Sequence, residues 1–178
     1  MTLWYSARNI FDKTDTGWKK YIDFSGLTQT EEIVFLDSIL NDPLLLIRIM
    51  KDWELALTNP DNCHFTDCYS NLDYVLSKTK DKKAFNLLAL CFQPTSSCNN
   101  FSLDNFTFMG YDLLDQSHGN SALTNCGGTP EVFANSELNK FGLVDNYDRV
   151  TEIQMELLNN DPMNIMRTQI FGQFGAII

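Results

Sequence analysis

Two stretches of sequence decide the fold that we expect: AFNLLALCF at residues 84–92 and FTFMGYDLL at residues 106–114. The first is a short apolar run closed by Gln93-Pro94, and it predicts a central β-strand. The second alternates well enough for a strand, and Gly110 within it marks a bulge or a close backbone approach. Residues 94–105 are rich in Ser and Asn, so they predict an exposed loop between the two strands.

Helix signals surround these strands. Residues 71–78 place apolar side chains at helical spacing, and Asn146 is expected to cap a helix whose apolar stripe lies opposite Arg149, Glu152 and Glu156. Two further helices are predicted from their first residues: a capping box at Thr28-Gln29-Thr30-Glu31 opens one that runs to about Leu40, and Thr129-Pro130-Glu131 opens one that ends near Asn139, with Gly142 as a left-handed stop.

The remaining patterns are shorter. Residues 18–24 (WKKYIDF) and 121–126 predict short strands, residues 164–174 are strand-like, and the apolar run at 44–57 fits either a helix or a buried strand. Strands and helices are mixed without regular alternation, which favours an α+β fold: a single domain over residues 1–178, with a partly antiparallel sheet and helices packed on one face. A chain of 178 residues is long enough to bury one real core.

The charge balance narrows the classes of partner. The chain carries 13 Lys+Arg and 23 Asp+Glu, a formal net charge of −10. Such a surface repels phosphate backbones, so we expect no nucleic-acid binding, whereas the same field attracts basic partners. No signal peptide and no membrane-spanning run are found, so a cytoplasmic protein without membrane contact is expected.

The five cysteines form an odd set and are interpreted as reduced thiols, several of them buried. Cys63-His64 and Cys68 supply three possible zinc ligands, but a fourth would have to come from a distant residue. We therefore predict no metal and no other cofactor.

Catalytic signatures are absent: the sequence contains no Walker loop, GxGxxG, GxSxG or HExxH. Cys126 stands before Gly127-Gly128 and a predicted helix start, where its pKa would be depressed, and His118 and Asp112 are the other groups that an enzyme hypothesis would use. The simpler interpretation is a small buried thiol beside a turn. We predict that the chain is not an enzyme and has no catalytic residue.

Four phrases carry a resemblance to known proteins: MGYDLLD (109–115), SALTNCGG (121–128), ANSELNKFGLV (134–144) and YDRVTEIQMELL (147–158). In these phrases the chain resembles small bacterial proteins that act as immunity partners of secreted or contact-delivered toxins. The resemblance implies a cytoplasmic protein that binds a cognate toxin tightly and blocks it. It carries over no functional residue.

Acidity fits an inhibitor that occludes a basic toxin, for example a nuclease, and that is a monomer when free. The residues predicted to bind this partner are five carboxylates and one aromatic anchor: Asp104, Tyr111, Asp112, Asp115, Glu131 and Glu137. The same acids would also suit a solvated, solubilising face. The alternatives are the enzyme described above and a homo-oligomeric regulatory module that associates through residues 44–57 or through Ile177-Ile178.

Overall fold

The computed structural model of the chain describes residues 3–10, 12–34, 68–69, 71–82, 84–92, 94, 98, 102–115, 121–124, 132–160 and 168–176. The predicted apolar run at 44–57, the predicted helix start at 129–131, and Cys63, His64, His118 and Cys126 lie outside these residues.

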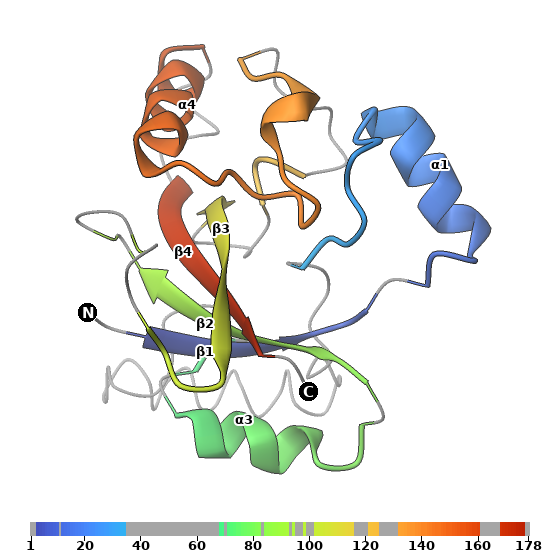
Figure 1. Ribbon diagram of the computed structural model, residues 1–178, viewed down its shortest axis with the longest axis vertical. Helices are drawn as coiled ribbons and strands as arrows, with labels where there is room; N and C mark the ends of the chain where they lie inside the picture. Colours follow the sequence, from blue (N-terminus) through green and yellow to red (C-terminus); the bar gives the residue numbers. More distant parts are fainter. Residues whose placement is uncertain are drawn as a thin grey trace.

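The described strands form one four-stranded sheet. Its members are β1 (Leu3–Arg8), β2 (Asn86–Phe92), β3 (Phe106–Asp115) and β4 (Thr168–Ala176), in the spatial order β1-β2-β4-β3. All three neighbouring pairs are antiparallel, so the described sheet is more regular than the partly antiparallel one that we expected (Figure 1). With its helices, this sheet makes the fold α+β, which confirms the predicted class.

The position of β2 follows from its composition. Leu88 and Leu90 pack in one core cluster with Trp4 and Phe171, while Ala89 and Cys91 belong to a second cluster. Successive side chains of a strand point to opposite faces, so a strand with two apolar faces is stable only inside a sheet that is covered on both sides. The predicted central strand is therefore confirmed.

A bulge shapes β3. The pairing of β3 with β4 shifts between Phe108 and Gly110, and Gly110 has a φ of 141°, a value that favours glycine. A Cβ at this position would lie 2.7 Å from the Cβ of Leu143, so the close approach predicted from the sequence is also present.

Within the described residues, three α-helices and one short 3-10 helix accompany the sheet. They are α1 (Thr16–Ser25), α3 (Leu72–Thr79), η1 (Asn135–Glu137) and α4 (Tyr147–Asn160). In the view of Figure 1, α4 and η1 lie near the upper ends of β3 and β4, α3 lies below β1, and α1 lies to the right. The predicted helices at 71–78 and after Asn146 are thereby confirmed as α3 and α4.

The strand predicted at residues 18–24 is wrong, because this segment is α1. Asp15 accepts a hydrogen bond from the backbone N–H of Gly17 at 2.9 Å, and Gly26 ends the helix in the left-handed region with a φ of 69°. Trp18, which is buried, and Ile22 recur at helical spacing. The apolar pattern of this segment fits either a strand or a helix, and the caps at Asp15 and Gly26 favour the helix.

The start of the helix predicted from the 28–31 capping box to about Leu40 is also corrected, while residues 35–40 lie outside the described part of the chain. Residues 28–34 are not helical, and the backbone N–H groups of Glu31 and Glu32 both donate to the carbonyl of Lys140, at 2.8 and 2.9 Å. The carbonyl of Lys140 thus accepts backbone N–H groups that would lie unpaired in the first turn of a helix. Near Asn139 only the three residues of η1 are helical, while Gly142 does adopt the predicted left-handed φ, at 71°.

Candidate functional site

Exposed carboxylates gather on α4 and η1. The helix begins after Asn146, whose side-chain oxygen accepts the backbone N–H of Arg149 at 2.9 Å, and it buries Val150, Ile153 and Leu157. The opposite side of α4 is exposed. We call the exposed set on α4, together with Glu137 of η1, the α4 acidic surface; its members are Glu137, Asp148, Glu152, Met155 and Glu156.

Arg149 holds three of these carboxylates together. Its Nε and Nη2 donate to the two oxygens of Glu137 at 2.5 and 3.2 Å, and its Nη1 reaches Glu152 at 3.2 Å and Glu156 at 3.4 Å. The two-pronged bond to Glu137 is the strongest of these contacts in geometry. One cation is therefore shared among three anions, and the α4 acidic surface keeps a net negative charge.

Arg149 and Glu137 shift each other's pKa. The guanidinium of Arg149 is the main cause that lowers the pKa of Glu137, and the backbone N–H of Ala134, which donates to Glu137 at 2.8 Å, lowers it further. The hydrogen bond to Glu137 likewise raises the pKa of Arg149. Both groups are therefore charged at neutral pH.

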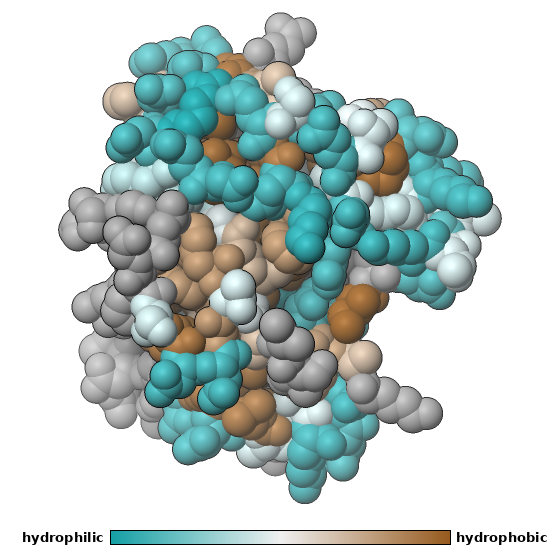
Figure 2. Space-filling model, viewed as in Figure 1, coloured by the Kyte–Doolittle hydropathy of each residue, from teal (hydrophilic) through white to brown (hydrophobic). Residues whose placement is uncertain are grey.

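Met155 adds an apolar side chain to this surface. It is 54% exposed, and it lies on the same helical stripe as Asp148 and Glu152, which precede it by seven and three residues. Figure 2 shows mostly hydrophilic side chains over α4 and η1. An adaptable thioether among carboxylates is a suitable anchor for a protein partner.

Asp112, which we expected on the partner surface, lies inside the molecule. It is 1% exposed and accepts hydrogen bonds from the hydroxyl of Ser121 at 2.5 Å, the backbone N–H of Leu113 at 2.8 Å and the amide of Gln173 at 2.8 Å. Burial raises the pKa of Asp112 to about 6, although these bonds oppose the shift. The prediction that Asp112 contacts a partner is therefore wrong, because its side chain is buried. The same burial means that Asp112 is not accessible as an acid–base group.

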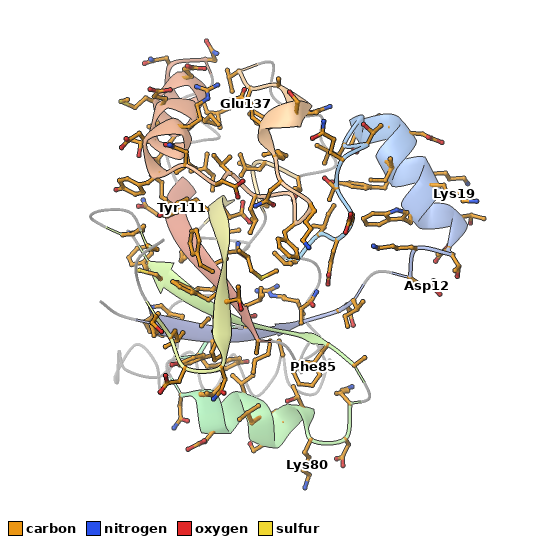
Figure 3. The ribbon with its side chains drawn as sticks, in the orientation of Figure 1. Asp12, Lys19, Lys80, Phe85, Tyr111 and Glu137 are labelled. Carbon is orange, nitrogen blue, oxygen red and sulfur yellow. The ribbon has the colours of Figure 1, made fainter. Side chains whose placement is uncertain are left out.

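Tyr111 is also buried, with no exposed surface. Its hydroxyl accepts the backbone N–H of Cys98 at 2.5 Å, and its ring packs edge-on against Phe108 and Tyr147 (Figure 3). A side chain enclosed in this way cannot act as an exposed anchor, so this part of the prediction is corrected.

The other predicted residues have different positions. Asp104 is exposed in a tight turn, where Asn105 has a left-handed φ of 64° and the N–H of Phe106 donates to the carbonyl of Leu103 at 3.0 Å. Asp115 is the last residue of β3, and its side chain is outside what the structure describes, as is all of Glu131. Of the predicted set, Glu137 alone is placed in the α4 acidic surface.

Met155, Glu152 and Glu156 were not among the residues predicted from the sequence to bind a partner. The signal was present, since these residues lie opposite the apolar stripe of a correctly predicted helix. The helical pattern could not predict the ion pair between Arg149 and Glu137, because these residues belong to different elements.

No arrangement for a metal is found among the described residues, which contain no group of three or more His, Cys, Asp or Glu side chains able to hold an ion. Cys68, the described member of the predicted zinc set, is buried, and its sulfur lies 3.8 Å from the Nη2 of Arg8. In the same part of the chain, no helix has the length and apolar composition needed to cross a membrane.

The α4 acidic surface is thus the candidate site: three exposed or partly exposed carboxylates around one arginine, with the exposed Asp148 and Met155 on the same helix. Its interpretation rests on this geometry, because the chain matches no family model, no curated protein and no solved structure.

Proposed function

We propose that this chain is an immunity-type inhibitor that binds a basic toxin domain of the nuclease class and occludes its active site. The observation that carries the proposal is the α4 acidic surface, where Glu137, Glu152 and Glu156 surround one arginine. A nuclease needs Lys and Arg side chains where it holds phosphates, and carboxylates on a partner can occupy the same positions.

The electrostatics suit fast association. The chain carries a net charge of −10, and exposed charges at the rim of an interface raise the rate of encounter more than they raise the final affinity. Asp148 and Glu152 have exposed side chains, so a cation on the partner can reach them without a rearrangement of the fold.

Met155 supports the slower part of binding. Charged pairs at a rim are screened by salt, so residence time depends on apolar side chains that become buried at the centre of the interface. A methionine that is 54% exposed between carboxylates has surface left to bury.

The experiment is capture followed by an activity assay. The tagged chain is used to isolate partners from host lysate in which the adjacent toxin locus is expressed, and the nuclease activity of the captured protein is measured with and without the chain. We expect one stoichiometric basic partner whose activity is lost in the complex. A complex that leaves the nuclease activity unchanged overturns the proposal.

A matched pair of variants tests the assigned surface. Glu152→Lys with Glu156→Lys reverses two charges on α4, whereas Asp23→Lys with Asp81→Lys makes the same charge change at exposed positions on α1 and after α3. We expect the α4 pair to slow association by roughly tenfold or more at low salt, and the control pair to change it by roughly twofold. Equal effects would mean that overall charge, and not this surface, directs binding.

A further inference from the structure

Two cysteines lie together in the core, apart from the α4 acidic surface. Cys91 is on β2 and Cys98 is in the segment that follows it, and their exposed fractions are 0% and 3%. Their side chains lie close enough for each to shift the pKa of the other. Nothing in the proposed inhibitory function uses this pair.

Gly172 of β4 makes room for the pair. It is the direct neighbour of Cys91 across the sheet, and a Cβ at this position would lie 2.8 Å from the sulfur of Cys98. The same point is 3.4 Å from the Cβ of Cys98 and 3.6 Å from the Cβ of Cys91. The missing side chain of Gly172 therefore leaves a hollow over β4 in which the side chain of Cys98 lies against that of Cys91.

Tyr111 fixes Cys98 from the other side. The tyrosine hydroxyl accepts the backbone N–H of Cys98 at 2.5 Å. The neighbouring Cys91 and Tyr111 side chains lower the pKa of Cys98, whereas Cys98 and burial raise the pKa of Cys91. The two thiols are therefore unequal, and Cys98 is the one that favours the thiolate form that reacts with oxidants.

We propose that Cys91 and Cys98 form an oxidative modification site, at which a small hydroperoxide converts the pair to an intramolecular disulfide. The Cys98 thiolate attacks the peroxide oxygen; with one proton, hydrogen peroxide is reduced to water and Cys98 becomes a sulfenic acid. The sulfur of Cys91 then attacks the sulfur of this sulfenic acid. A disulfide forms, and the thiol hydrogen leaves with the hydroxyl group as a second water.

Among the three described cysteines, the geometry favours reaction between these two residues. A disulfide needs Cβ atoms about 3.5–4.5 Å apart, and both Cβ atoms of the pair lie close to the same point above Gly172. Cys68, the other described cysteine, belongs to a different core cluster with Trp4. Oxidation would link Cys98 covalently to the C-terminal end of β2.

The test uses the full-length folded protein and hydrogen peroxide as the probe. After timed exposure, remaining thiols are alkylated under denaturing conditions at acid pH, and the peptides are mapped by mass. We expect a cross-linked peptide pair containing Cys91 and Cys98, lighter by two hydrogen atoms and restored by a reductant. Alkylation of both residues after prolonged exposure, or sulfinic acid at Cys98 without a cross-link, overturns the proposal.

Three variants serve as controls. Cys98→Ser is expected to abolish the cross-link, and Cys68→Ser to leave its rate unchanged. Gly172→Ala places a methyl group against the sulfur of Cys98, so it should slow cross-linking by roughly tenfold while the circular dichroism spectrum stays native. Equal cross-linking in Gly172→Ala and the unaltered protein, or random pairing among all cysteines, contradicts a site built by the fold.

Discussion

Asp112 and Glu137 are carboxylates that the sequence placed in one predicted binding set, and the structure gives them opposite surroundings. Asp112 is enclosed, and its partners are the neutral donors of Ser121, Leu113 and Gln173. Glu137 keeps 31% of its side chain exposed and is bound by the guanidinium of Arg149. Desolvation governs the first group, and an opposite charge governs the second.

The two groups consequently respond to acid in opposite directions. Burial raises the pKa of Asp112 to about 6, so the folded state favours its neutral form. The pKa of Glu137 is lowered by Arg149, so the folded state favours its charged form. Acid therefore strengthens the fold at Asp112 and weakens it at Glu137, which shows that residue type alone does not decide what a carboxylate contributes.

The largest loss of stability is expected when the buried carboxylate of Asp112, which accepts three hydrogen bonds, is removed. Asp112→Ala leaves the hydroxyl of Ser121 and the N–H groups of Leu113 and Gln173 without their acceptor. A buried donor without a partner costs about 1–3 kcal/mol, so the free energy of unfolding should fall by about 3 kcal/mol. Urea denaturation at pH 7 measures the change.

Asp112→Asn is the matched control, because it retains an acceptor oxygen and a similar volume without the charge. Its stability at pH 7 should equal or exceed that of the unaltered protein, since no ionised group is buried. If Asn destabilised the fold as much as Ala does, the charge of Asp112 and not its acceptor geometry would be what the cluster needs.

The second effect is a dependence on pH. The folded pKa of Asp112, about 6, lies above its ordinary value of 3.8, so its stabilising contribution is complete below pH 3.8 and is lost as the pH rises through 6. A difference of this size corresponds to about 3 kcal/mol. The stability of the unaltered protein relative to Asp112→Asn should decline by that amount between about pH 3 and pH 7 in urea titrations. A constant difference between the two proteins would contradict the raised pKa.

These carboxylates also show how far the sequence could be interpreted. β2, β3, α3 and α4 were predictable because their signals are local: an apolar run, an alternation, and a cap followed by an apolar stripe. The burial of Asp112 was not predictable from the local pattern, because its partners Ser121 and Gln173 come from other segments of the chain. The bulge at Gly110 resets the alternation of β3, so that Phe108 and Tyr111 share a face although they are three residues apart.

The candidate site likewise has one part that the sequence predicts and one part that it does not. The exposed side of α4 follows from its helical period, so Glu152 and Met155 could be assigned to the surface from the sequence alone. The contact of Arg149 with Glu137 joins α4 to η1, and the local pattern near Asn139 predicted a longer helix than the three residues found. Contacts between elements depend on packing, and one sequence alone does not specify them.

A smaller effect is expected at the partly exposed ion pair. Glu137→Gln keeps an oxygen for the N–H of Ala134 but removes the charge opposite Arg149, so the free energy of unfolding should fall by about 1 kcal/mol at pH 7. Because the pKa of Glu137 is lowered from 4.5, this loss should disappear as the pH falls below 4.5. A double-mutant cycle with Arg149→Gln measures the coupling, and a coupling of zero would mean that the two-pronged contact adds nothing to stability.

The smallest effect on stability is expected at Glu152, whose side chain is 58% exposed and lies 3.2 Å from Arg149. Glu152→Gln should change the free energy of unfolding by only about 0.3 kcal/mol at low salt and by nothing measurable at about 1 M salt, where the pair is screened. Thermal unfolding at the two salt concentrations gives the comparison. A loss as large as that of Glu137→Gln would show that Glu152 is needed to hold α4 against η1. A negligible loss would mean that its charge is dispensable for folding and remains available to a partner, as the α4 acidic surface requires.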